Sequence, residues 1–92
     1  MSMIAKVMGG GTLVGGRAMI EGPGAPTVMA EGFVVSVMND MVASHGEGAH
    51  AKATIVTSSK TVFAMGRGVV RMGDVATCGD PVISASTVLV GA

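Results

Sequence analysis

The sequence predicts an all-β domain: a small pyramid or cone of short strands and hairpins with pseudo-three-fold internal repeats. A short phrase occurs three times, its copies are rich in β-branched residues, and each closes on glycine. No segment has the periodicity of an amphipathic helix over a useful length. With 92 residues, two Phe, no Tyr and no Trp, the chain makes a single domain, 1–92, whose core depends on Val, Ile and Met.

The first phrase of the repeat is TVMAEG at residues 27–32. Residues 61–66 (TVFAMG) repeat it at an offset of 34, and residues 87–91 (TVLVG) form a third copy at the end of the chain. Glycine in Glu31-Gly32 and Met65-Gly66 supplies the positive φ that a tight hairpin needs, so each phrase is predicted to begin a β-hairpin.

The second phrase occurs at residues 35–40 and 69–74, and its third copy, residues 5–10, lies at the start of the chain. The chain therefore ends on half of a unit and begins with the other half. We expect the N-terminal strand to pair with the C-terminal segment and close the third unit. The predicted units are about 3–32, 33–66 and 67–92.

The connectors after the second phrase contain further strand candidates at residues 18–20, 54–56 and 82–83. If three units surround an axis, their connecting turns converge at one end and form a site to which each turn can supply a ligand. Counting four and five residues beyond Gly10, Asp40 and Asp74 gives the expected positions, which are Val14, Ser44 and Cys78, followed by Gly15, His45 and Gly79.

His45, His50 and Cys78 are the candidate metal ligands in these turns. Imidazole and thiolate suit zinc or iron, and a single Cys rules out an internal disulfide, so a small domain with a thin core has use for a metal crosslink. Considered separately, Cys78 is also consistent with a small buried apolar residue, and each His is also consistent with an exposed loop residue. The metal hypothesis depends on all three falling in converging turns.

Composition and motifs argue against several other functions. The net charge is zero and no basic run indicates nucleic-acid binding. No stretch approaches a membrane span, and the N-terminus lacks the apolar region of a secretory signal. His45 and His50 are five apart in a glycine-rich loop, unlike the helical zinc motif of metalloproteases, and nothing suggests an oxyanion site for Cys78. The chain is therefore predicted not to be an enzyme.

The arrangement resembles the PAAR-repeat proteins. Residues 59–74 (SKTVFAMGRGVVRMGD) follow the family phrase closely, and residues 73–79 keep its Gly-Asp and Cys-Gly pairs. Residues 68–71 (GVVR) stand where the family has Pro-Ala-Ala-Arg, with earlier copies at 34–37 and 4–7, so the name-giving tetrapeptide is nowhere literal. The resemblance covers essentially the whole chain.

The resemblance implies a β pyramid whose apex holds one metal ion per chain, Zn²⁺ or alternatively iron, bound by His45, His50 and Cys78. Val14 takes the place where the family usually offers another histidine, which puts metal occupancy in question. Water, Asp80 and Ser44 are the candidates for the fourth position.

The resemblance further implies a structural spike-tip cap of a contractile injection machine, either a phage tail or a type VI secretion-like apparatus. Its partner would be a trimeric β-helical spike, VgrG-like or a phage central spike, with one monomer on each homotrimer, no nucleic acid and only transient contact with a target membrane. We expect it to be made in the cytoplasm without a signal peptide, then exported or built into the tail tip. The alternative is a free-standing metal-binding module, a carrier or sensor.

Overall fold

The computed structural model of the chain describes residues 2–90 and confirms the all-β prediction. Within these residues there is no α-helix, and the one helical turn is the 3₁₀ turn η1 (Gly48–His50). The strands pair as antiparallel two-stranded ladders: β1 with β10, β2 with β9, β3 with β6, β4 with β5 and β7 with β8. In chain order they are β1 (Ser2–Met3), β2 (Leu13–Val14), β3 (Ile20–Gly22), β4 (Ala25–Ala30), β5 (Phe33–Val35), β6 (Met41–Val42), β7 (Phe63–Ala64), β8 (Arg67–Gly68), β9 (Val82–Ile83) and β10 (Leu89–Val90).

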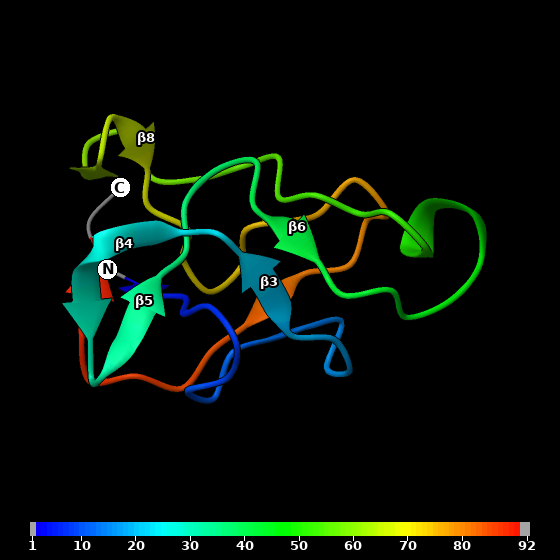
Figure 1. Cartoon of the computed structure of the whole chain (residues 1–92), viewed down its shortest axis with the longest axis horizontal. Coiled ribbons are helices and arrows are strands. Elements are labelled where there is room, and N and C mark those ends of the chain that lie inside the picture. The colour runs from blue at the N-terminus through cyan, green and yellow to red at the C-terminus, as the bar shows by residue number, and fades with distance from the viewer. Residues whose placement is uncertain (1, 91–92) are drawn as a thin grey trace.

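The molecule tapers along its longest axis, which measures 31 Å against 23 and 22 Å for the other two. Figure 1 places β4, β5, β8 and the red strand β10 at the broad end, with β3 and β6 in the middle. The loop that carries η1 forms the narrow end. This is the cone that the sequence predicts.

Three central segments hydrogen-bond to one another in a closed ring, which we call the axial ring. The N–H of Ala5 donates to the carbonyl of Val70 (2.9 Å), Val70 donates to Ser36 (3.0 Å), and Ser36 donates back to Ala5 (3.0 Å). All three residues are fully buried. The same relation connects each segment to the next, so the internal three-fold symmetry is present in the backbone. Isolated bridges repeat it beside the ring: Ile4 with Arg71, Lys6 with Val35, and Val37 with Val69.

Hairpins form the broad end. The turn Glu31-Gly32 joins β4 to β5 with φ of 54° and 85°, and Met65-Gly66 joins β7 to β8 with φ of 50° and 82°. Two successive positive φ values define the type I′ turn that matches the twist of paired strands. The third pair is closed by the two ends of the chain, where Met3 of β1 pairs with Leu89 of β10. Among the described residues, the N-terminal strand therefore pairs with the last strand of the chain. The unit boundaries 3–32, 33–66 and 67–92 stay a prediction.

The core is aliphatic and follows the same symmetry. Ile20, Ile55 and Val82 lie at equivalent positions of the three connectors, and each is fully buried. Their carbonyl groups accept hydrogen bonds from equivalent N–H groups of the three units, at 2.8 to 2.9 Å. Ala, Val and Ile side chains fill the centre of the domain, and both Phe side chains lie exposed at the surface.

These hydrogen bonds correct the predicted alignment of the first unit by one residue. The donors to the three connector carbonyls are Met8, Asn39 and Gly73, and all have positive φ, at 59°, 73° and 94°. Because Asn39 and Gly73 directly precede Asp40 and Asp74, the residue that corresponds to those aspartates is Gly9, one position before the predicted Gly10. The axial ring places Ala5, not Lys6, opposite Ser36 and Val70, and this fixes the shift of one residue. After Gly9, residues 10–12 are an insertion that lengthens the first unit before the next strand.

The expectation that Val14 corresponds to Ser44 and Cys78 is consequently wrong. Val14 is fully buried in the core and donates its N–H to the carbonyl of Ala18 at 2.7 Å. The equivalent donors are Val42 to Ala53 (2.9 Å) and Ala76 to Asp80 (3.0 Å). By this pattern Gly16 is the counterpart of Cys78 in the first unit, so Val14 does not take the place of a ligand.

In each unit a polar side chain accepts a hydrogen bond from the equivalent backbone N–H group. In the second and third units it is the aspartate that follows the left-handed residue, and in the first unit a threonine replaces it. The pairs are Asp40 Oδ2 with Val37 N–H (2.9 Å), Asp74 Oδ2 with Arg71 N–H (2.7 Å) and Thr12 Oγ1 with Lys6 N–H (3.0 Å). The two aspartates are therefore turn-stabilising residues, as local carboxylate-to-backbone bonds often are.

Candidate metal centre

Three turns meet at the narrow end of the molecule, one from each unit: residues 15–18, 43–53 and 77–80. The N–H at the start of each turn donates to a carbonyl of another connector, which ties the turns side by side. The pairs are Gly15 with Pro81 (2.8 Å), Ala43 with Met19 (2.9 Å) and Thr77 with Thr54 (2.8 Å). The convergence that the repeat pattern predicts is therefore present.

The second turn is the longest and carries both histidines. Its base is closed by the N–H of His45, which donates to the carbonyl of His50 at 3.1 Å. The imidazole of His45 is 4% exposed, and its Nδ1–H donates to the carbonyl of Ala43 at 2.9 Å. Because a carbonyl only accepts, this bond places a proton on Nδ1, so Nε2 is the nitrogen through which the neutral ring can bind a metal. Metal-bound histidines usually have this second hydrogen bond to a carbonyl or carboxylate.

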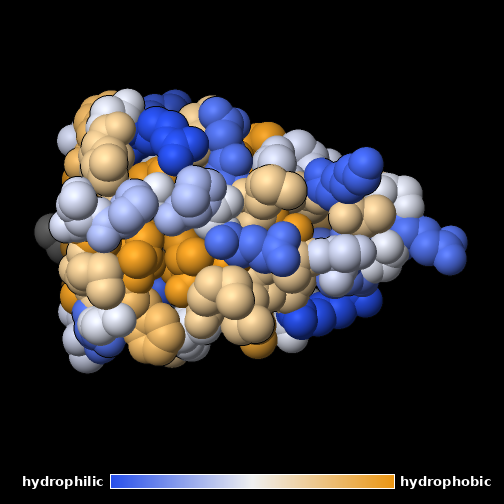
Figure 2. All heavy atoms as spheres, viewed as in Figure 1, coloured by the Kyte–Doolittle hydropathy of each residue, from blue (hydrophilic) through white to orange (hydrophobic). Residues whose placement is uncertain are grey.

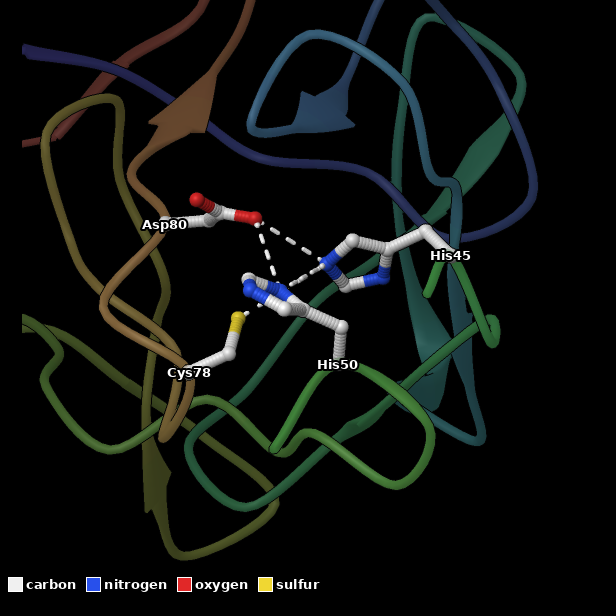
Figure 3. Close-up of side chains that lie close together, drawn as sticks. All are labelled: His45, His50, Cys78 and Asp80. Carbon is white, nitrogen blue, oxygen red and sulfur yellow. Dashed lines mark hydrogen bonds and ion pairs between the residues drawn. The ribbon is translucent and has the colours of Figure 1, made fainter. Parts of the chain in front are cut away.

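The third turn carries Cys78 and Asp80. It is a tight turn in which Gly79, at φ 88°, donates its N–H to the carbonyl of Ala76 at 2.9 Å. The left-handed glycine lets the chain reverse within two residues, and both flanking side chains face the second turn, as Figure 3 shows. Cys78 is a free thiol and is partly buried.

Four ligand atoms from these two turns gather within 4.8 Å of one another: one nitrogen each of His45 and His50, the Sγ of Cys78 and an oxygen of Asp80 (Figure 3). The Nε2 of His45 lies 3.0 Å from Asp80 Oδ2, 3.2 Å from His50 Nδ1 and 3.7 Å from Cys78 Sγ. The Nδ1 of His50 lies 3.3 Å from the same Asp80 oxygen. In a tetrahedral site with bonds of about 2.0–2.3 Å, neighbouring ligand atoms lie roughly 3.3–3.8 Å apart. The spacing of the cluster is close to that of such a site.

The electrostatics of the cluster favour a positive charge at its centre. Desolvation acts to raise the pKa of Asp80, but the hydrogen bond with His45 and the charge of His50 lower it. Cys78 and Arg17 act in the same direction, and the pKa of Asp80 lies below its ordinary value. The free Nε2 of His45 and the Asp80 carboxylate are both acceptors, so either a proton or a metal ion must lie between them. A divalent cation satisfies all four groups at once, and the cluster is able to bind one.

A sequence model of the PAAR motif matches residues 8–84 of the chain. The chain belongs to the PAAR-motif family. Members of this family are structural spike-tip proteins of type VI secretion systems and phage-like machines. Among curated proteins no match was found. In the described part of this PAAR chain, no helix is long and apolar enough to span a membrane.

The structure brings together all three site residues predicted from the sequence, His45, His50 and Cys78. It adds Asp80, which the sequence offered only as one of several candidates for the fourth position. Ser44, another of those candidates, is exposed. The signal for Asp80 was its spacing, because a residue two positions after Cys78 across a glycine returns to the same side of a tight turn. The first turn of the PAAR domain contributes no His, Cys, Asp or Glu.

Proposed function

We propose that the protein caps the blunt end of a trimeric β-helical spike, of the VgrG-like or phage central spike type, and gives it a sharp tip. The observation that carries this proposal is the three-fold set of exposed apolar side chains at the broad end. Val28, Val62 and Val88 occupy the same place in the three phrases and are 37%, 37% and 38% exposed. A trimer presents the same surface three times around its axis, so a matching cap needs near-equal contacts at three positions.

The residues that follow these valines strengthen the argument. Met29, Phe63 and Leu89 are again equivalent, and they are 54%, 61% and 54% exposed. Large apolar side chains exposed in a repeated arrangement mark an interaction surface more than a scattered set does. In Figure 2 apolar residues gather over the broad half of the visible face, and polar residues gather toward the narrow end. The two ends therefore have different chemistry, as a cap with one docking end and one leading end requires.

The narrow end is the proposed metal-pinned apex. His45, His50 and Cys78 supply two nitrogens and a sulfur, the donor set that favours zinc over hard cations, and we propose one Zn²⁺ per chain. When bound, the ion would crosslink turns that belong to different units. The N–H···O=C bond of His45 already fixes its ring with Nε2 toward the centre. We expect a tip held in this way to resist force although its core is thin.

Co-purification with the spike tests the docking proposal, and two variants with matched exposure make it specific. Met29 at the broad end and Met41 on β6 are both 54% exposed. Replacing Met29 by Asp places an unpaired charge in the proposed interface and should weaken binding about 100-fold or more. Met41→Asp should bind like the wild type.

Equal binding of the two variants, or no association of the wild type at micromolar concentration, would refute the docking proposal. A wild type that exchanges zinc freely and stays monomeric beside the spike would instead indicate a free-standing metal carrier or sensor.

A further inference from the structure

The first turn, residues 15–18, lies beside the metal cluster although it offers no ligand of its own. Two of its residues lie next to Asp80. Gly15 has no side chain and leaves space for the carboxylate, and Arg17 brings a positive charge close to it. The arrangement suggests that this turn acts on the cluster indirectly, through the aspartate.

Gly15 leaves room for the carboxylate. A Cβ at this position would lie 2.7 Å from Asp80 Oδ2 and 2.8 Å from its Cγ, so any other residue would displace the aspartate. The Gly15 N–H also donates to the carbonyl of Pro81 at 2.8 Å, which fixes the chain next to Asp80. Its neighbour Gly16 has nearly the same φ, 73° against 62°, but a Cβ there would meet nothing within 4 Å. Glycine is therefore favoured at position 15 for two reasons: the positive φ, and the lack of space for a Cβ beside Asp80.

Arg17 supplies the charge. Its Nη2 lies 3.9 Å from Asp80 Oδ2, the same oxygen that faces His45 and His50. The Arg17 side chain is 59% exposed, so the ion pair adds little to stability by itself. Its position still biases the orientation of the carboxylate, because the Arg17 cation attracts the same oxygen that lies near the two imidazoles.

We propose that Asp80 is the fourth metal ligand of this chain, and that Gly15 and Arg17 position its carboxylate in the cluster. The proposal rests on the metal-binding role inferred above. Two neutral imidazoles, one thiolate and one carboxylate would balance the charge of a divalent ion, and Asp80 Oδ2 already lies 3.0 and 3.3 Å from the two histidine nitrogens. In this arrangement all three units contribute to the apex, two through ligands and the first through a cradle for one of them.

Zinc affinity, measured by competition with a chromophoric chelator, tests the ligand. Asp80→Asn keeps the size of the side chain and removes its charge, and Glu47→Gln, on the exposed tip loop, is the control. Losing a group that only supports a ligand costs roughly 10–100-fold in affinity, so losing Asp80 itself should cost more than about 100-fold. Co²⁺ absorption gives a second readout, since the tetrahedral d–d bands of the wild type should shift or fade in Asp80→Asn.

Gly15→Ala and Gly16→Ala test the cradle. Both place alanine at a positive φ and carry similar backbone strain, but only Gly15→Ala forces Asp80 away. We expect Gly15→Ala to weaken zinc binding at least 10-fold more than Gly16→Ala, a margin within the usual effect of a supporting residue.

Arg17→Gln should weaken zinc binding about 10-fold in the wild type, Arg17→Lys should restore most of it, and Arg17→Gln should have no further effect in Asp80→Asn. A purely structural role of Arg17 would keep its effect in both backgrounds.

The outcomes separate this inference from the function on which it rests. Wild-type protein that binds zinc tightly together with an Asp80→Asn variant that binds equally well would overturn the role of Asp80 and leave the metal-pinned apex intact. Wild-type protein that binds no zinc would overturn both. Equal zinc affinities of Gly15→Ala and Gly16→Ala would refute the cradle.

Discussion

The backbone N–H of Ala5 donates a 2.9 Å hydrogen bond to the carbonyl of Val70, which joins the first and last thirds of the chain at the centre of the molecule. The same bond recurs between the other two pairs of units, so the axial ring has no free edge. Closed pairing of this kind stabilises strands that are too short to persist alone. It also makes the fold depend on contacts between distant parts of the chain, and the first predictions address those contacts.

Replacing Ile55 by Ala should destabilise the whole domain. Ile55 is fully buried where the three connectors meet, and removing a buried Ile side chain costs about 2–5 kcal/mol of the free energy of unfolding. Ile83, on β9, is 43% exposed, and Ile83→Ala should cost less than about 1 kcal/mol. Urea denaturation of the two variants measures the difference. Equal losses would contradict the assignment of Ile55 to the core.

Asp40→Ala should also be strongly destabilising. The buried carboxylate accepts hydrogen bonds from the N–H of Gly24, the Oγ–H of Ser36 and the N–H of Val37, at 2.8 to 3.0 Å. Its removal leaves three buried donors without their partner, at a cost of about 3 kcal/mol or more. Glu47→Ala, at an exposed position, should change stability by less than about 0.5 kcal/mol. Thermal denaturation of both variants checks the prediction, and a mild effect of Asp40→Ala would show that water replaces the carboxylate.

Part of the loss of stability in acid should come from protonation of Glu31. Its Oε1 lies 2.7 Å from Lys6 Nζ, and bonds from Lys6 and Ser86 lower the pKa of Glu31 from 4.5 to about 2. Because the folded-state pKa is the lower one, the contribution of Glu31 is complete above about pH 4.5 and is lost as the pH falls toward 2.

Urea midpoints of the wild type and Glu31→Gln, measured in chelator from pH 7 to pH 2, provide the test. The wild type should be the more stable at pH 7, and the gap should narrow below pH 4.5 and close near pH 2. A gap that is independent of pH would mean that the carboxylate charge adds nothing.

Removing the metal should reduce hydrogen-exchange protection at the apex and leave protection of the remaining domain unchanged. The 3₁₀ turn Gly48–His50 has no buried residue, so beyond the backbone bond from His45 to His50 its loop is attached through the side chains of these two histidines. Zinc at a thousandfold excess over its Kd adds about 4 kcal/mol, which for a domain of this size raises Tm by more than about 15 °C. Hydrogen exchange in chelator should show lost protection at residues 46–52 and retained protection at Ile55 and Val70. Cys78→Ser should show a smaller Tm response to zinc, and uniform loss of protection would argue against a separate apex.

The hairpins and the ligand cluster were predictable because their signals are local or repeated. Glu31-Gly32 and Met65-Gly66 mark tight turns by sequence alone, and the matching phrases placed His45, His50 and Cys78 in converging turns. A repeat identified in sequence implies contact in space when each unit cannot bury its apolar face alone.

The first unit was less predictable for physical reasons. Met8 matches Met38 and Met72 by residue type, but Val7 is their counterpart in the structure. Residues 10–12 then lengthen the first unit, so Val14 was assigned to the wrong place. Thr12 accepts the backbone hydrogen bond that an aspartate accepts in the other two units, and the residue type alone does not predict this role. The effect of Arg17 on Asp80 depends on the packing of two turns, which spacing along the chain does not encode.

Native mass spectrometry of the protein bound to its trimeric spike tests the central claim most directly. A pseudo-three-fold cap predicts a complex of three spike chains with a single copy of this chain and one zinc ion, and the metal should persist in the complex. Three copies per trimer, or a spike that stays free at micromolar concentration, would contradict the proposed cap.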